Sequence, residues 1–205
     1  TLEWSDEGVQ GASRFLKRVW RAVHVHVAGG PAPPVTGVEL TGARKDLRRQ
    51  VHQTLAKVGD DIGRRRTFNT AIAAVMELLN AVNRAEVSTP ADRAVIQEAL
   101  DLMVLMLSPI VPHICHRLWN VLGHAGAVID QPWPAPDPAA LEADTREIVV
   151  QVNGKVRGRV TVAATASESD VRAAALADDN VQRFVAGQSV RKVIVVPGKL
   201  VNVVV

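Results

Sequence analysis

The sequence predicts an α+β protein in which an all-α helical bundle over residues 1–130 precedes a small α+β domain over residues 146–205. Three observations support this prediction. Apolar residues recur at three- and four-residue steps through the first part, the spacing of amphipathic helices. Four prolines then follow between Pro132 and Pro138, where no regular structure is expected, so residues 131–145 are predicted to be a linker. Beyond Ile148 the apolar period changes to two, which is typical of strands.

Five helices are expected in the bundle. Ser5 is a suitable N-cap for the first, because its hydroxyl can accept a free backbone N–H. Pro90 and Pro112 stand in the first turns of the fourth and fifth, where a missing N–H costs little. The apolar stripes that define these helices run over residues 9–27, 47–62, 72–82, 96–107 and 112–122.

The small domain is expected to follow the order ββααββ. Asn153-Gly154 lies between two β-branched runs and predicts a tight hairpin, because both residues tolerate positive φ. Ser167 and Asp170 have the spacing of a capping box and predict a helix start. A second short helix ends at Gly187, and two further strands are expected over residues 190–196 and 200–205.

Composition excludes several classes of protein. The 205 residues contain 24 Lys+Arg and 21 Asp+Glu, and no apolar run is long enough to cross a membrane. The single cysteine, Cys115, excludes a disulfide framework and a four-cysteine zinc site and fits a reducing cytosol. Aromatic residues make up 3% with no Tyr, which gives no stacking platform for single strands. The tryptophans are instead expected to be packing residues, at Trp4, Trp20, Trp119 and Trp133.

No catalytic motif is present. GxGxxG, GxxxxGK[ST], GxSxG and HExxH are all absent. His113, Cys115 and His116 resemble a metal cluster, but no fourth ligand is near and packing explains the cysteine better. Asp60 and Asp61 are adjacent, so they diverge on a helix and are expected to pair with neighbouring arginines. No catalytic, cofactor-binding or metal-binding residue is therefore predicted in this chain.

Basic residues are clustered rather than spread. Residues 44–66 contain eight basic against three acidic side chains, and residues 180–205 contain four against none. Arg64, Arg65 and Arg66 are consecutive, so they either grip phosphates or complement a helix C-terminus. Asn69 and Thr70 follow and are expected to cap the next helix.

A second basic cluster is expected in the small domain. Lys155, Arg157 and Arg159 alternate along one predicted strand, and period two would place them on one sheet face. Arg191, Lys192 and Lys199 add to the charge of this domain. Both a phosphate-binding surface and a plain solvated face remain open.

Five segments carry a resemblance to a known family. They are residues 11–20, 60–80, 107–115, 150–157 and 190–202. Together they make the chain similar to the bacterial leucyl-tRNA synthetase family along its whole length. The first three resemble the anticodon-binding helical domain of that family, and the last two, with their NGKVR and VRKVI sequences, resemble its C-terminal domain.

The resemblance implies a helical bundle of the class I anticodon-binding type and a small domain that reaches the outer corner of tRNA. The family joins leucine to tRNA(Leu) with ATP and Mg²⁺, but its HIGH and KMSKS signatures do not occur here. We therefore expect a C-terminal fragment that binds tRNA(Leu) and the remaining domains of the synthetase, holds no cofactor itself, and is monomeric, cytoplasmic and without membrane contact. Recognition by shape and phosphate contacts suits this composition.

The expected tRNA contacts follow from the basic clusters. In the bundle they are Arg14, Lys17, Arg18, Arg21, Arg64, Arg65 and Arg66, and in the small domain Lys155, Arg157, Arg191, Lys192 and Lys199. Two alternatives stay open. One is a docking module without RNA selectivity, and the other is a standalone enzyme built on His113, Cys115 and His116.

Overall fold

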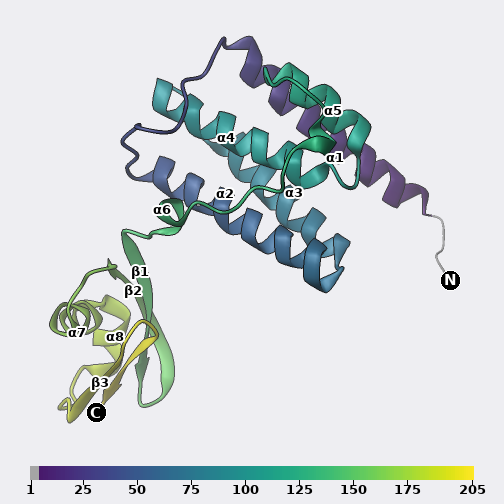
Figure 1. Cartoon of the computed structure of the whole chain (residues 1–205). Helices are drawn as coiled ribbons and strands as arrows, with labels where there is room; N and C mark the ends of the chain where they lie inside the picture. Colours follow the sequence, from purple (N-terminus) through teal and green to yellow (C-terminus); the bar gives the residue numbers. More distant parts are fainter. Residues whose placement is uncertain (1–4) are drawn as a thin grey trace. The chain divides into compact units, whose positions relative to one another are not determined.

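The structure, a computed structural model, describes residues 5–205 and divides into two units with the boundary between Glu142 and Ala143. The first unit is helical and the second carries the sheet, so the chain is α+β as predicted (Figure 1). Among residues 5–205, no helix is long and apolar enough to span a membrane. The expectation for Trp4 lies outside the described residues.

Five longer helices build the first unit. The five helices are α1 Asp6–Ala28, α2 Ala43–Asp60, α3 Phe68–Arg84, α4 Pro90–Leu107 and α5 Pro112–Val121. The unit also contains a π-helical turn, η1 Asp61–Arg65, a 3-10 turn, η2 Val128–Asp130, and a one-turn helix, α6 Pro138–Leu141. Residues 29–42 form a long connection between α1 and α2, and the later connections are shorter.

Local sequence explains where these helices begin. The Ser5 hydroxyl accepts the backbone N–H of Gly8 at 3.2 Å and caps α1. Thr89 and Asp92 form a reciprocal capping box at the start of α4, which satisfies two otherwise free N–H groups. Proline occupies the first turn of both α4 and α5. The capping residues and first-turn prolines therefore begin these helices where the apolar stripes predict them.

The core of the first unit is aliphatic. Its largest fully buried side chains include Leu55, Leu78, Leu100 and Met103, contributed by α2, α3 and α4. Of the described tryptophans, only Trp119 is buried. Trp20 and Trp133 are 38% and 44% exposed, so neither is a core residue, although Trp20 packs on His24 with ring centroids 4.5 Å apart.

The proline-rich segment differs from the expected structureless linker. Pro138 begins the one-turn helix α6, and Asp137 caps it by accepting the Ala139 N–H at 2.9 Å. The Asp137 carboxylate also receives Arg48 Nη2 at 2.7 Å, and its backbone N–H donates to His52 Nδ1 at 3.1 Å. These contacts fix the segment to α2. The prolines prevent a continuous helix, but the side chain and backbone N–H of Asp137 still bond to α2.

The second unit is a four-stranded mixed sheet with two helices. Strand order is β2-β1-β4-β3, with β1 parallel to β4 and the other neighbouring pairs antiparallel. The register of β1 against β2 shifts between Val150 and Gln151 at a β-bulge. The bounds are β1 Thr145–Val152, β2 Lys155–Ala163, α7 Glu168–Ala177, α8 Asp179–Val185, β3 Lys192–Val196 and β4 Leu200–Val204.

One face of this sheet makes the second core. Ile148, Val150, Val201 and Val203 are almost wholly buried against α7 and α8. The hairpin turn at Asn153 has φ 48°, the positive value that the Asn-Gly pair predicts. The opposite face of the sheet carries none of the buried core residues.

Candidate nucleic-acid interface

A row of basic side chains runs along α1. Arg14, Lys17, Arg18 and Arg21 follow the spacing i, i+3, i+4 and i+7, so one exposed helix face carries all four. Arg18 Nη2 donates to Asn80 Oδ1 of α3. The other three have no acidic partner within residues 5–205, which leaves their charge available to an anion.

A hollow beside this row adds a further arginine. Arg18 and Arg21 line a cavity of about 550 Å³ together with His26 and Arg93. Arg93 donates to the carbonyl oxygens of His26, at 3.2 Å, and Gly30. Burial chiefly lowers the pKa of His26, and the Arg93 charge acts in the same direction, so its ring is neutral near pH 7. Sequence reasoning missed Arg93 because it joins α1 only through tertiary packing.

The three consecutive arginines have different surroundings. Arg64 makes a bidentate pair with Asp60 at 2.6 and 2.8 Å, and Arg65 contacts Asp61 at 3.1 Å. The expected pairing of these two acids is thus confirmed. The Arg64 guanidinium lowers the pKa of Asp60. Arg66 has φ 55° at the end of the turn and no ion pair within the described part of the chain, so it is the free cation of the three.

The start of α3 corrects the expected caps. Thr67 is the N-cap residue, and the Thr70 hydroxyl donates to the Thr67 carbonyl at 2.8 Å, so neither Asn69 nor Thr70 caps this helix. Phe68 stands beside the arginines and is 45% exposed. It is a stacking candidate that low aromatic content concealed, because composition says nothing about where an aromatic lies.

The two basic clusters of the first unit occupy different levels of α3. Arg66 precedes the N-cap Thr67 at the start of the helix, whereas Arg18 contacts the helix at Asn80, twelve residues beyond Phe68. At 1.5 Å per residue this separation is about 18 Å along the axis. Within residues 5–205 no hydrogen bond or ion pair joins the two clusters, and their separation suits an extended phosphate backbone better than one small anion.

The basic residues of β2 do not share one face, contrary to the expectation for Lys155, Arg157 and Arg159. The bulge makes Arg157 an extra residue between the pairs Gln151–Val156 and Val150–Gly158. Lys155 pairs with buried Val152 on the helix-covered side, while Arg159 pairs with Val149 on the other side. The β-bulge inserts one residue into β2, so its side chains no longer alternate between the two sheet faces as they do in a regular strand.

Arg157 lies against α8. Its guanidinium carbon stands 3.9 Å from the centre of the Phe184 ring, a cation–π contact. Its Nε is buried without a hydrogen-bond partner in the structure. The terminal nitrogens carry no ion pair to any described residue, which leaves this cation oriented but without a counter-charge.

Arg191, Lys192 and Lys199 mark opposite ends of the β3–β4 pair. The Arg191 N–H donates to the Val204 carbonyl at 2.8 Å, and Lys192 pairs with the same Val204. Lys199 lies in the turn between β3 and β4. All three are exposed, and none has an acidic partner within residues 5–205.

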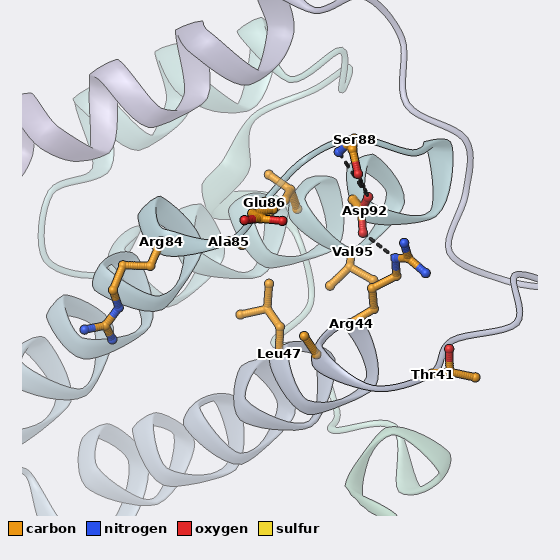
Figure 2. A pocket seen from close by; sticks show the side chains of 11 residues that line it. Thr41, Arg44, Leu47, Arg84, Ala85, Glu86, Ser88, Asp92 and Val95 are labelled. Atoms are coloured by element: carbon orange, nitrogen blue, oxygen red, sulfur yellow. Dashed lines mark hydrogen bonds and ion pairs between the residues drawn. The ribbon is translucent and has the colours of Figure 1, made fainter.

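The pocket drawn in Figure 2 is a structural feature of the bundle. It has a volume of about 440 Å³. Within it Asp92 accepts from the Ser88 and Thr89 N–H groups and pairs with Arg44. Arg44 chiefly lowers the pKa of Asp92, which keeps this half of the capping box ionised. No predicted site residue lines this pocket.

The cluster of His113, Cys115 and His116 lacks the features of a reactive site. Cys115 is buried, as expected for a packing residue, and burial raises the pKa of its thiol to about 12. The His116 ring lies within hydrogen-bond distance of the Asn120 side chain and the Val128 N–H. Within residues 5–205 no group of three or more His, Cys, Asp or Glu side chains has an arrangement suited to a metal ion.

Comparison with known proteins adds to this geometry. Residues 44–172 match the family described as "Anticodon-binding domain of tRNA ligase". The chain is 60% identical over 205 residues to a leucine–tRNA ligase of Thioalkalivibrio sulfidiphilus, covering 100% of this chain and 25% of that protein. It is 61% identical over 204 residues to that of Marinobacter nauticus, covering 100% and 24%. The chain thus spans about a quarter of the length of these relatives.

A solved structure is also similar over nearly the whole chain. It is described as the ternary complex of Agrobacterium radiobacter K84 agnB2 LeuRS-tRNA-LeuAMS. The TM-score is 0.82 at 27% identity, covering 99% of this chain and 26% of the other. The similarity therefore includes both units.

Proposed function

The chain belongs to the family of anticodon-binding domains of tRNA ligases, and on that premise we propose that it is the tRNA-binding part of a leucine–tRNA ligase. The observation that carries the proposal is identity of 60% to such a ligase along the entire chain. The unpaired cations of α1 and of the sheet unit give this proposal its physical basis. The chain positions tRNA(Leu), and ATP and Mg²⁺ act elsewhere in the ligase.

The two units divide the work. The first corresponds to a class I-type anticodon-binding bundle that supports the tRNA backbone through Arg14, Lys17, Arg21 and Arg66. The second, a ββααββ domain, holds another part of the tRNA through Arg157, Arg191, Lys192 and Lys199. Further positive charge near these proposed contacts comes from Arg18, Arg64, Arg65 and Lys155. These contacts go to phosphates, which position RNA without reading its sequence.

The remaining domains of the ligase are the second proposed partner. An apolar hollow of about 440 Å³ between α1 and α5 includes Val9, Leu16, Trp20 and Ile114. Val9 and Trp20 are 46% and 38% exposed. Because the relatives are four times longer than this chain, we assign this strip to contact with another domain of the same enzyme. The ligase is expected to be a cytoplasmic monomer.

Charge-removing variants test the tRNA contacts. We expect Arg191→Ala with Lys192→Ala to weaken binding of a leucine tRNA transcript and to lower the salt slope, d log K/d log[salt], by roughly one to two units. Arg14→Gln with Lys17→Gln is expected to act similarly. Arg117→Gln removes an exposed charge of α5 outside both clusters and serves as the control. An unchanged slope in a double variant would remove its two residues from the interface, and so would a change per lost charge no larger than that of Arg117→Gln.

A further inference from the structure

The segment that joins the bundle to the sheet unit lies against α2. We call residues 133–141 the strap, which ends with α6 and belongs to the first unit. Trp133 lies over Gly59, where an added Cβ would stand 3.2 Å from the indole Nε1. Asp137 bonds to His52, which precedes Gly59 in α2, and α6 packs on the same helix (Figure 1). The strap therefore runs along α2 in the opposite direction.

The spacing of these two anchors fits an extended strap. The four residue steps from Trp133 to Asp137 cover about 13 Å at about 3.3 Å per step. The seven steps from His52 to Gly59 cover about 11 Å of α2 at about 1.5 Å per step. The two lengths agree, and the prolines between Trp133 and Asp137 favour extended backbone. Both anchors can therefore form at the same time.

The hydrogen bonds of His52 are compatible with one protonation state only. Arg48 holds Glu98 through a bidentate pair at 2.8 and 3.0 Å, and a paired carboxylate only accepts hydrogen bonds. The His52 Nε2, 3.3 Å from Glu98 Oε1, must therefore carry the proton. The Asp137 backbone N–H can only donate, so the His52 Nδ1, at 3.1 Å, must accept. The strap is thus anchored by a neutral imidazole.

The charges around His52 favour uptake of a second proton. Four charged groups line the same hollow of about 500 Å³, namely Arg48 of α2, Glu98 and Asp101 of α4, and Asp137 of the strap. The loop of residues 33–36, which also lines the hollow, carries no charge. Burial opposes the charge of Glu98, but hydrogen bonds from His52 and Arg48 outweigh burial and lower its pKa. Three carboxylates against one guanidinium make this imidazole a candidate pH sensor.

A second proton on His52 is incompatible with the strap anchor. The doubly protonated ring donates from both nitrogens, so its Nδ1–H would face the Asp137 N–H where a bond now forms. His52 is 4% exposed, which leaves the ring little room to turn toward water. Glu98 still accepts from the Nε2–H, and the added charge strengthens that bond. The conflict is relieved by release of the strap, while the contact within the bundle is kept.

The anchor sets the length of chain that joins the two units. With the strap in place, residues 142–144 connect α6 to β1, and three extended residues reach about 10 Å. Loss of the Asp137 anchor frees the residue that caps α6, and a single helical turn has little stability of its own. The joining chain would then include residues 134–144 and reach about 37 Å.

We propose that His52 is a positioning residue whose neutral ring holds the strap on α2 and whose protonation releases it, which lengthens the tether of the sheet unit. The consequence rests on the proposed function, because two units that contact one tRNA bind it more tightly when the chain joining them is short. Effective concentration falls with roughly the −3/2 power of that length, so release should weaken two-unit binding about five- to tenfold.

NMR relaxation of the 205-residue chain tests the strap in the absence of RNA. Between pH 8 and pH 5.5, the heteronuclear NOE of strap amides should fall from the values of α2 to those of a mobile segment. The ring nitrogen shifts of His52 should change over the same range from the neutral Nε2–H form to the doubly protonated form. His52→Asn keeps an acceptor near Nδ1 and does not titrate, so its strap should stay ordered at both pH values. His52→Ala lacks the acceptor and should show a mobile strap at both.

Binding of a leucine tRNA tests the effect on the tether. The parent chain should lose about five- to tenfold more affinity between pH 8 and pH 5.5 than His52→Asn does. The matched control is His124→Gln, because His124 also pairs with an acid, Asp101 at 2.7 Å, but makes no hydrogen bond to the strap within the described residues. This control should keep the pH response of the parent chain.

The contrary results separate the strap from the proposed function. A strap that is equally ordered at both pH values in the parent chain would overturn the inference, and so would release that persists in His52→Asn. Release of the strap with the same loss of tRNA affinity in the parent and in His52→Asn would overturn its effect on the tether. A parent chain that does not bind leucine tRNA at pH 8 would overturn the proposed function, while the relaxation measurements would still test the role of His52.

Discussion

Asp92 is a nearly buried acid whose removal should damage the helical unit. Its side chain is 8% exposed, accepts from the Ser88 N–H at 3.1 Å and pairs with Arg44 (Figure 2). It also accepts from the Thr89 N–H at 2.8 Å. Asp92→Ala removes the capping box, worth about 1 kcal/mol, and leaves Arg44 and two N–H groups without their acceptor. We expect a total loss of about 3 kcal/mol in the free energy of unfolding.

Urea and thermal unfolding of the whole chain measure this loss. For a unit of this size, about 3 kcal/mol corresponds to a fall in Tm of roughly 6–12 °C. The sheet unit should unfold as it does in the parent chain, since none of the contacts of Asp92 reach it. Glu86→Ala changes an exposed acid of the same pocket and should stay within about 0.5 kcal/mol of the parent. A loss below about 1 kcal/mol for Asp92→Ala would refute the reasoning.

Three further predictions concern pH, reactivity and the hairpin. The pKa of Asp92 is lowered from its ordinary 3.8, so its stabilising effect is complete above pH 3.8 and declines as pH falls below that value. In Asp92→Ala the free energy of unfolding should therefore fall less steeply with acid than it does in the parent chain. An unchanged pH profile would contradict the assignment. The Cys115 thiol has a pKa of about 12 and the residue is 1% exposed. It should therefore react with iodoacetamide at pH 8 far more slowly in the native chain than in urea, and equal rates would show an accessible thiol. Asn153→Ala forces alanine to φ 48° and removes the acceptor of the Val205 N–H, so the sheet unit should lose about 1–2 kcal/mol in urea unfolding, and no loss would mean that the turn is not held this way.

The fold was predictable wherever local patterns and packing agree. The helices and strands follow apolar periods of 3.6 and two, and Ser5, Pro90, Asn153 and Ser167 stand at the boundaries that their backbone chemistry favours. The order of strands in the sheet was not predictable in the same way. Placing β4 between β1 and β3 depends on long-range pairing that no local signal records.

The candidate site was predictable only in part. Arg14, Lys17 and Arg21 belong to the predicted first helix, but that they share one face of α1 was read only from the structure. The alternation of β2 failed at Arg157, since a bulge inserts one residue and redirects its side chain to Phe184. Contacts between distant segments, such as those of Arg93 with His26 and Gly30, become visible only when the fold brings their residues together.

Selectivity among tRNAs is the most direct test of the central claim. The 205-residue chain should be titrated at several salt concentrations with a leucine tRNA, a serine tRNA and a tRNA with a short variable arm. The account predicts tightest binding to the leucine tRNA with a steep salt slope, because both units contact one folded RNA. Equal and weak binding to all three would contradict it and would leave the chain as a docking module without RNA selectivity of its own.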